Sequence, residues 1–377
     1  MAKSGRKPNV ALTIGVDCGA LSQQPEENYG GIYTLAVNLL VELGRLDKRN
    51  HYLLYSFAPI SKELMRQFGR EMKNIVLRPR LGYKTVWLPL ALKLQAADAF
   101  MALSQAVPRG APPILGFIYD LAFLKYPNAY IQPAKLKHNT DEIVRESAHL
   151  ITLSEASKTD IIKRYRLDND RVTVAYPGVE RIFRPRGPKF IDTKPYFLYV
   201  GALKKTKNIP KLIEGFVLFR RGSQKDFKLL LVGSLKDMDP EVTNTITRLK
   251  LAKRVVLKGY VDRFDLPKYY RGAIALVTPA LYEGFGLPLV EAMASGCPVV
   301  AAKNSSMPEV MGKFGIMVSA SKPEEITKAM QKLVDDSQYR IKMITAGFRQ
   351  ARRFNNRNFA RIVLKNVYWC LKKRQIR

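Results

Sequence analysis

Short apolar runs alternate with longer, more polar segments through the first half of the chain. The runs are bounded by turn residues, which is typical of buried strands. The segments between them carry apolar residues at helical spacing, as at Leu35, Leu39 and Leu43. Because strands that alternate with helices form a parallel sheet, this half predicts a doubly wound α/β domain. Strands are expected at residues 10–16, 51–57, 74–77, 99–102, 114–119, 149–153 and 172–175.

A second alternating series begins at residue 196. Residues 182–195 contain three prolines, a glycine and alternating charge, and therefore resemble a linker. Strands are expected at residues 196–200, 227–232, 255–257, 274–277, 298–301 and 316–318. This half predicts a second Rossmann-like domain, in which ligands bind beyond the carboxyl ends of the strands. The loops there, YVGALKKTKN, LVGSLKD, LKGYV and EGFGLP, are expected to face one cleft.

The segment 279–310 holds two glutamates, Glu283 and Glu291, on either side of the glycine-rich turn GFGLP. Pro288 is expected to begin a helix, because proline is favoured at the first helical position. A helix N-terminus offers unpaired N–H groups, and glycines let a ligand approach the backbone, so the turn predicts an anion site. Hydroxyl groups that flank the anion could be held by the two glutamates. A phosphate between two polyols is a nucleotide sugar.

These residues resemble the family 4 glycosyltransferases, whose E-x7-E signature contains FG(L/I)P and is followed by G-x-P-V-(I/V) and PEV. The resemblance implies a retaining glycosyltransferase of GT-B architecture, in which two Rossmann-like domains face a cleft. The implied domains are an acceptor domain at 1–181, a linker at 182–195, a nucleotide-sugar domain at 196–355 and a helix at 356–377 that returns to the first domain. Glu283 would face the donor sugar and Glu291 would bind the ribose. The turn residues Gly284, Phe285, Gly286 and Leu287 would contact the donor.

The loop YVGALKKTKN resembles the family's Y-V-G-x-x-x-x-R-K-N, whose arginine and lysine clamp the donor diphosphate. Here Thr206 stands at the arginine position and Lys207 remains. A fixed cation stabilises the charge that develops on a leaving diphosphate. Lys204 or Lys205 could substitute for the arginine, although without its bidentate geometry. Donor contacts are expected in these strand-end loops at Gly201, Lys205, Thr206, Gly233 and Tyr260.

Motifs in the first domain extend the resemblance. Tyr29, Gly30 and Gly31 resemble the family's diglycine loop, which lies against the donor phosphates. FIYDLAFLKYP resembles V-x-H-D-L-x-F-x-x-x-P, whose histidine lies near the transferred sugar, but this chain has Tyr119 before Asp120. A phenol does not titrate near neutral pH, so the histidine's usual role is in doubt. The expected catalytic residues are Glu283, Lys207, Tyr119 and Asp120.

The net charge of +31 predicts an acidic neighbour. Nucleic acid, an anionic membrane, phosphate-rich ligands and a generally basic proteome are all open explanations. Residues 61–73 read as an amphipathic helix capped by Ser61, with Arg66, Arg70 and Lys73 around an apolar face, which is a membrane-surface pattern. The alternative is a basic face over an ordinary core-packed helix. No sequence motif of a nucleic-acid-binding protein is found, so no specific nucleic acid is expected.

Other features limit the class of protein. Three widely spaced cysteines, Cys18, Cys297 and Cys370, suit neither a disulfide framework nor a zinc site and favour a reducing cytoplasm. No signal peptide is recognised, and no apolar run approaches the ~20 residues of a spanning helix. No D-x-D motif in a strand-end loop suggests a divalent ion, so no metal or other cofactor is expected.

The resulting hypothesis is a retaining transferase that moves a hexose from a nucleotide diphosphate sugar to a glycan or lipid-linked acceptor without a metal. GDP-mannose is the first choice of donor, and UDP-sugars are open. The enzyme would act in polysaccharide biosynthesis, in the cytoplasm or peripherally at the inner membrane face. The alternative is an inactive basic protein of the same fold that binds anionic lipid or nucleic acid; Thr206 and Tyr119 support it.

Overall fold

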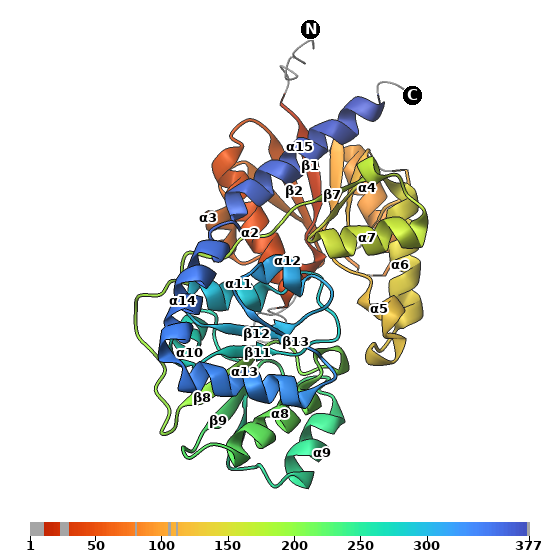
Figure 1. Cartoon of the computed structure of the whole chain (residues 1–377). Helices are drawn as coiled ribbons and strands as arrows, with labels where there is room; N and C mark the ends of the chain where they lie inside the picture. The colour runs from red at the N-terminus through yellow and green to blue at the C-terminus, as the bar shows by residue number, and fades with distance from the viewer. Residues whose placement is uncertain (1–10, 23–29, 80, 105–106, 111, 375–377) are drawn as a thin grey trace.

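The computed structural model describes residues 11–22, 30–79, 81–104, 107–110 and 112–374. Two parallel sheets, each covered by helices on both faces, form two domains stacked along the long axis of the molecule (Figure 1). The strand orders are β3-β2-β1-β4-β5-β6-β7 in the first sheet and β10-β9-β8-β11-β12-β13 in the second. The predicted α/β fold class with two Rossmann-like domains is confirmed.

The first sheet follows the apolar runs of the sequence, with ends that differ from the expected ones by at most three residues. Val10, which the expected first strand included, lies outside the described residues. The strands are β1 (Thr13–Asp17), β2 (His51–Ser56), β3 (Met72–Val76), β4 (Ala99–Ala102), β5 (Ile114–Phe117), β6 (Ser147–Thr152) and β7 (Val172–Val174). The main helices are α2 (Gly31–Leu46), α3 (Lys62–Phe68), α4 (Leu88–Leu94), α5 (Ala122–Lys125), α6 (Pro133–Glu146) and α7 (Glu155–Tyr165), and a π-helical turn, η2 (Tyr83–Trp87), precedes α4.

The two faces of this sheet bury separate hydrophobic clusters. Leu35, Leu39 and Leu43 of α2 pack in one cluster with Ile14 and Val16 of β1, as their helical spacing predicts. The opposite face packs against α4, α6 and α7 in a second cluster. Both faces of the central strands are therefore buried, as is usual for a parallel sheet.

The single helix expected across residues 61–73 is wrong. Ser61 does cap α3, because its hydroxyl accepts a hydrogen bond from the Leu64 N–H at 3.2 Å, but α3 ends at Phe68. Gly69 has φ of 103°, which ends the helix, and Met72 begins β3. Phe68 is fully buried, and Leu64 packs on the core. The apolar face of α3 is therefore turned inward, as in the alternative reading of this segment.

The second sheet also agrees with the expected runs. Its strands are β8 (Tyr196–Val200), β9 (Lys228–Val232), β10 (Val255–Gly259), β11 (Leu276–Thr278), β12 (Val299–Ala302) and β13 (Ile316–Val318). Its helices are α8 (Ile209–Arg221), α9 (Pro240–Arg248), α10 (Leu266–Gly272), α11 (Leu287–Ala294), α12 (Met307–Met311), α13 (Pro323–Asp335) and α14 (Ser337–Ala351). Helices α8, α9 and α13 cover one face, and α11 and α12 lie between the other face and the first domain (Figure 1).

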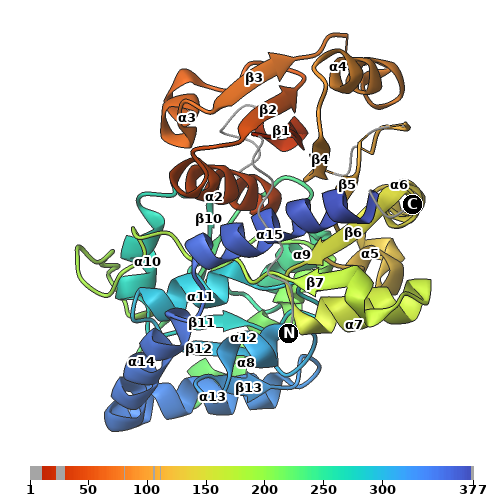
Figure 2. The same cartoon turned by 90° about the horizontal axis from the view of Figure 1, so that it is seen from above.

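The last helix, α15 (Asn356–Arg374), crosses from the second domain to the first, as the resemblance predicted. It lies along α2 and reaches β4, β5 and β6 (Figures 1 and 2). Its residues Phe359, Val363 and Val367 are buried in the cluster that also holds the inner face of α2. The crossing is fixed where the Gly178 N–H donates to the Asn356 side chain at 2.8 Å. The two domains are thus joined by residues 175–195 and by the entry into α15.

Candidate nucleotide-sugar site

A pocket of about 320 Å³ lies between the two domains, at the carboxyl ends of the strands. Gly30, at the start of α2, faces the loops after β8, β9 and β10 across it. Its lining includes four predicted donor contacts, Gly30, Gly201, Gly233 and Tyr260, and also Lys204, Lys236 and Arg263. Gly31 is the exposed first residue of α2, and Tyr29 lies outside the described residues. The volume is at the lower end of the range for small-molecule sites.

Gly233 shows why two of these loops can meet. Its φ is 153°, and a Cβ atom there would lie 1.9 Å from the Gly201 carbonyl oxygen. Only glycine allows this close approach. The glycines after β8 and β9 therefore form a backbone floor, against which a ligand can lie without side chains in between.

The EGFGLP turn packs directly on the first domain. A Cβ atom at Gly284 would lie 2.8 Å from both the Asp120 carboxylate and the Tyr119 carbonyl oxygen. Behind the turn, the buried Ser306 hydroxyl donates to the carbonyl oxygens of Glu283 at 2.8 Å and Phe285 at 3.1 Å. Helix α11 begins at Leu287, one residue before the expected Pro288. The SSMPEV loop thus fixes the backbone that carries Glu283.

Phe285 and Leu287 turn their side chains into the core and not toward the pocket. The Phe285 ring is buried and packs against Tyr176 and Phe354, with ring centroids 6.2 and 5.3 Å apart. Leu287 packs on the edge of the same hydrophobic cluster. At these two residues, only the backbone groups could therefore make the predicted donor contacts.

Three of the four predicted catalytic side chains gather at this turn. Lys207 Nζ donates to Glu283 Oε1 at 2.7 Å, and both side chains keep about a fifth of their surface exposed, 22% and 19%. Asp120 lies beside Gly284, where the charges of Lys207 and Glu283 both affect its pKa. Burial raises the pKa of Asp120, the Ala122 N–H and Lys207 oppose this rise, and Glu283 adds to it. A cation and two carboxyl groups therefore meet at the domain boundary.

Tyr119 does not join this group. Its hydroxyl donates to the Leu103 carbonyl oxygen at 2.7 Å, and burial, with a smaller contribution from Asp17, raises its pKa. The expected catalytic position of Tyr119 is therefore not what the structure shows. The phenol satisfies a backbone acceptor after β4, whereas its neighbour Asp120 faces the turn.

Lys204 and Lys205, the lysines before Thr206, both line an open groove, and each also lines a second cavity that the other does not. Thr206 is buried, and its carbonyl oxygen accepts a hydrogen bond from the Leu281 N–H at 2.8 Å. Lys205, a predicted donor contact, lines a second cavity of about 220 Å³ with Lys125 and Tyr126. Lys204 lines the first pocket. Of the two candidates to replace the missing arginine, Lys204 is the one that reaches the nucleotide-sized pocket.

Glu291 is buried, with 4% of its surface exposed. Its two oxygens accept hydrogen bonds from Arg263 Nη1 at 3.0 Å and from the Tyr270 hydroxyl at 2.9 Å. Arg263, in turn, donates through Nε to Glu180 at 2.6 Å. Burial lowers the pKa of Arg263, but Glu291 and Glu180 raise it overall. Nothing in the sequence indicates Arg263, apart from its place three residues after Tyr260 in a strand-end loop.

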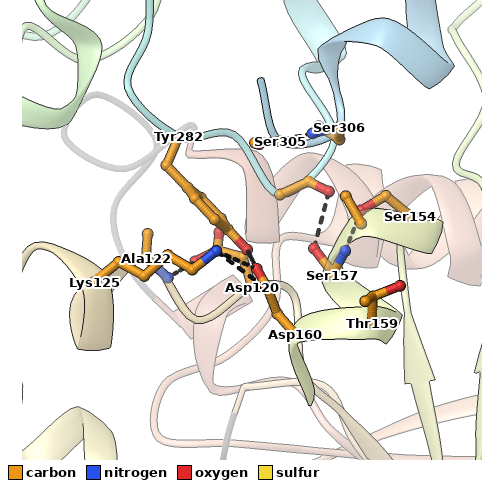
Figure 3. Close-up of polar contacts among 12 residues, drawn as sticks. Asp120, Ala122, Lys125, Ser154, Ser157, Thr159, Asp160, Tyr282, Ser305 and Ser306 are labelled. Atoms are coloured by element: carbon orange, nitrogen blue, oxygen red, sulfur yellow. Dashed lines mark hydrogen bonds and ion pairs between the residues drawn. The ribbon is translucent and has the colours of Figure 1, made fainter. Parts of the chain in front are cut away.

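The second domain contacts helix α7 of the first domain at several points (Figure 3). Ser154 caps α7, as expected, by accepting from the Ser157 N–H at 3.0 Å, and the Ser157 hydroxyl donates to the Gly284 carbonyl at 3.3 Å. The Tyr282 hydroxyl donates to Asp160 at 2.6 Å. Glu309 of the PEV motif accepts the N–H groups of Glu155 and Ala156 at 2.9 and 3.1 Å. The motif residues therefore hold the two domains together.

The described ranges contain no cluster of three or more histidine, cysteine, aspartate or glutamate side chains suited to a metal ion. They also contain no helix that is both long and apolar enough to cross a membrane. Cys18, Cys297 and Cys370 are buried free thiols.

The family described as glycosyl transferases group 1 matches residues 181–350. This match lies in the second half of the chain. The matched region contains every strand of the second sheet and both glutamates of the E-x7-E segment. The resemblance that the motifs predicted is thereby confirmed for this half.

Curated relatives of this chain include two proteins named O-antigen chain mannosyltransferases. The chain is 30% identical to O-antigen chain mannosyltransferase B of Escherichia coli over 223 residues, which is 56% of this chain and 58% of the relative. It is 27% identical to O-antigen chain mannosyltransferase RfbU of Salmonella typhimurium, over 57% of this chain and 59% of the relative. The chain thus matches these curated relatives over about three fifths of their length.

Solved glycosyltransferases share the whole fold. A sucrose-phosphate synthase from Thermosynechococcus elongatus superposes with a TM-score of 0.76 at 19% identity, over 96% of this chain and 99% of that one. HepE of Anabaena, solved in complex with UDP-glucose, superposes with a TM-score of 0.73 at 20% identity, over 95% and 99%. At this identity the likeness concerns the fold, and it confirms the GT-B architecture of both domains.

Proposed function

We propose that this protein is a retaining glycosyltransferase that moves a hexose from a nucleotide diphosphate sugar to a glycan or lipid-linked acceptor. The observation that carries the proposal is the meeting of Lys207, Glu283 and Asp120 at the glycine-rich turn. These side chains do not line the pocket between the domains, but the loop after β8 that carries Lys207 does. The match to the group 1 family in the second half supports the same reaction class.

The chain's own groups can carry the charge of the reaction without a metal. The bond between the anomeric carbon and the β-phosphate oxygen breaks, and the negative charge on the diphosphate grows. Lys207 and the N-terminus of α11 stabilise this charge where it develops. The acceptor hydroxyl forms the new bond on the same face and passes its proton to the β-phosphate oxygen. Glu283 is held by Lys207 in a position to orient the sugar.

Mannose from GDP-mannose is the first choice of donor. Relatives at 30% and 27% identity are named mannosyltransferases of O-antigen chains. UDP-sugars are the second choice, because a structural neighbour was solved with UDP-glucose. The two donors share a diphosphate, which the same residues would bind in both, and they differ in the base and in the sugar.

Incubation with GDP-mannose, UDP-glucose, UDP-galactose and UDP-N-acetylglucosamine tests the activity. We expect nucleotide release from one of these donors, with GDP-mannose preferred, and faster release when a suitable acceptor is added. If no donor releases nucleotide, even with acceptors present, the alternative of an inactive binding protein is favoured. Thr206 and Tyr119, which differ from the family's motifs, support that alternative. Thr206 is buried, and the Tyr119 hydroxyl donates to a backbone carbonyl oxygen.

We also propose that the acceptor domain attaches to an anionic membrane through the basic side chains of segment 61–73, but with a different apolar surface from the one expected in the sequence. The apolar face of α3 is packed on the core, and its exposed side chains are polar: Lys62, Glu63, Arg66 and Gln67. An exposed apolar stripe instead follows the carboxyl end of β3 along η2 and α4. It consists of Leu81, 88% exposed, Val86, Leu90, and Leu94, 73% exposed. The basic residues Lys93 and Arg109 line an open groove with Leu90.

A further inference from the structure

The segment that carries Glu283 is held by the first domain on both sides of that residue. Before it, the Tyr282 hydroxyl donates a hydrogen bond to Asp160 at 2.6 Å. After it, the Gly284 carbonyl oxygen accepts a hydrogen bond from the Ser157 hydroxyl at 3.3 Å. Asp160 and Ser157 both belong to α7, so one helix of the first domain holds both neighbours of Glu283. The position of Glu283 therefore depends on how α7 lies against the second domain.

The contact of Tyr282 with α7 is the stronger of the two, because its acceptor is a charged group. Tyr282 is buried, with 3% of its surface exposed. Lys125, the last residue of α5, donates to the two oxygens of Asp160 at 3.0 and 2.8 Å. Its Nζ also lies 4.9 Å from the centre of the Tyr282 ring. The three side chains therefore form one connected group across the domain boundary (Figure 3).

This group contacts the turn and not the nucleotide-sized pocket. The described lining of the pocket of about 320 Å³ does not include Tyr282, Asp160 or Lys125. Burial raises the pKa of Tyr282, and the carboxylate of Asp160 raises it further, so the phenol keeps its proton and donates the hydrogen bond. Removing the group should therefore disturb Glu283 through the adjacent Tyr282 and leave the pocket intact.

We propose that Tyr282, Asp160 and Lys125 are positioning residues, which hold the turn against α7 and so set the position of Glu283 in glycosyl transfer. This inference rests on the proposed function, because it takes Glu283 as the residue that orients the sugar. Tyr282 acts through the adjacent glutamate, Asp160 acts through Tyr282, and Lys125 acts by fixing Asp160. Glu283 is then correctly placed only when the second domain lies against α5 and α7 of the first.

The test measures nucleotide release from the donor that wild type prefers among the four sugar nucleotides. The variants are Tyr282→Phe, which keeps the buried ring and removes only its hydroxyl, Asp160→Asn and Lys125→Met. For each full-length variant, kcat and donor KM are measured, and nucleoside diphosphate affinity is measured by calorimetry. Tyr165→Phe is the matched control, because the Tyr165 hydroxyl also donates to an aspartate, Asp141 at 2.9 Å, but within the first domain.

Tyr282→Phe and Asp160→Asn should each lower kcat roughly tenfold, the worth of one hydrogen bond to a charged group. Donor KM and nucleotide affinity should stay unchanged, because the pocket is intact. Lys125→Met should lower kcat less, since Asp160 still accepts from Tyr282, and Tyr165→Phe should match wild type. The double variant of Tyr282→Phe with Glu283→Gln should be no slower than Glu283→Gln alone, because residues that act through one another are not additive.

Two results would overturn the inference. One is wild-type kcat in both Tyr282→Phe and Asp160→Asn. The other is a double variant that is slower than Glu283→Gln by the same factor that separates Tyr282→Phe from wild type, which a general loosening of the domains would give. If Asp160→Asn does not fold, Tyr282→Phe decides alone. A wild type that releases nucleotide from no donor contradicts the proposed function and this inference with it, whereas failure confined to the variants contradicts only the positioning role.

Discussion

At the scale of single residues, the turn before α11 brings a cation and two carboxyl groups together at the domain boundary. Lys207, Glu283 and Asp120 meet as their motifs suggested, because motif spacing fixes which strand-end loop carries each side chain. Tyr119 turns away, since a buried phenol needs an acceptor and finds one at Leu103. Arg263 was missed because its two partners are distant in sequence, and no local pattern reveals such a network.

The two lysines before Thr206 give a residue-scale prediction. Lys204→Met should weaken nucleoside diphosphate binding roughly tenfold, since one charge-assisted hydrogen bond is worth about 1.5–3 kcal/mol. Lys205→Met, the neighbouring control, should leave that affinity unchanged, because Lys205 lines a different cavity. Titration calorimetry with GDP and UDP measures both. Equal losses in the two variants would contradict the assignment of Lys204 to the pocket.

At the scale of elements, hydrophobic runs predicted the strands because a parallel sheet buries both faces and leaves a continuous apolar signal. Segment 61–73 shows where this approach fails. Its apolar residues fit helical spacing, but Gly69 ends the helix and the sheet takes Met72 into an edge strand. The pairing of β3 with β2 decided whether residues 72–76 form a helix or a strand, and the local sequence pattern does not reveal that pairing.

Glu309 caps α7 from the other domain, and its loss should weaken the junction. Glu309→Ala leaves the N–H groups of Glu155 and Ala156 without their acceptors. We expect a loss of about 1–2 kcal/mol in the free energy of unfolding, the usual worth of an N-cap. Urea unfolding followed by circular dichroism measures it. Glu309→Gln, which keeps one acceptor oxygen, should lose less, and an unchanged midpoint in Glu309→Ala would contradict the capping role.

The membrane prediction belongs to α3 and α4 together. Purified protein should cosediment with anionic liposomes and less with neutral ones, and added salt should weaken the binding. Replacing Arg66, Arg70 and Lys73 by glutamate should reduce it through charge, and replacing Leu90 and Leu94 by serine should reduce it through lost apolar contact.

Ile191→Ser is the matched control for the apolar change, because Ile191 is 84% exposed but belongs to the linker 182–195 and not to α4. Its binding should equal that of wild type. Binding of wild type to neutral and anionic liposomes alike, or to neither, would mean that the charge serves another purpose.

At the scale of the whole molecule, the two domains depend on one another. Helix α15 leaves the second domain and packs into the core of the first, so we expect the first domain to need this C-terminal helix for its stability. Removing residues 356–377 would expose the cluster that Phe359, Val363 and Val367 cover. At about 1.5–3 kcal/mol for each large apolar side chain, the loss approaches the total stability of a domain.

We therefore expect the truncated chain to lack a cooperative unfolding transition in its first domain, which urea denaturation followed by tyrosine and tryptophan fluorescence would detect. A single substitution, Arg361→Ala on the exposed side of α15, is the control and should unfold as wild type does. A truncated chain that unfolds with the wild-type midpoint would show that α15 is dispensable.

The central claim is that Lys207 and Glu283 carry glycosyl transfer at the turn of α11. The most direct test measures nucleotide release from the preferred donor by wild type, Lys207→Met and Glu283→Gln, with nucleoside diphosphate affinity measured on the same samples. Both variants should turn over roughly a hundredfold more slowly or worse, as when one charge-stabilising group is lost, while Glu283→Gln keeps its affinity for the nucleotide. Wild-type turnover in both variants would contradict the account.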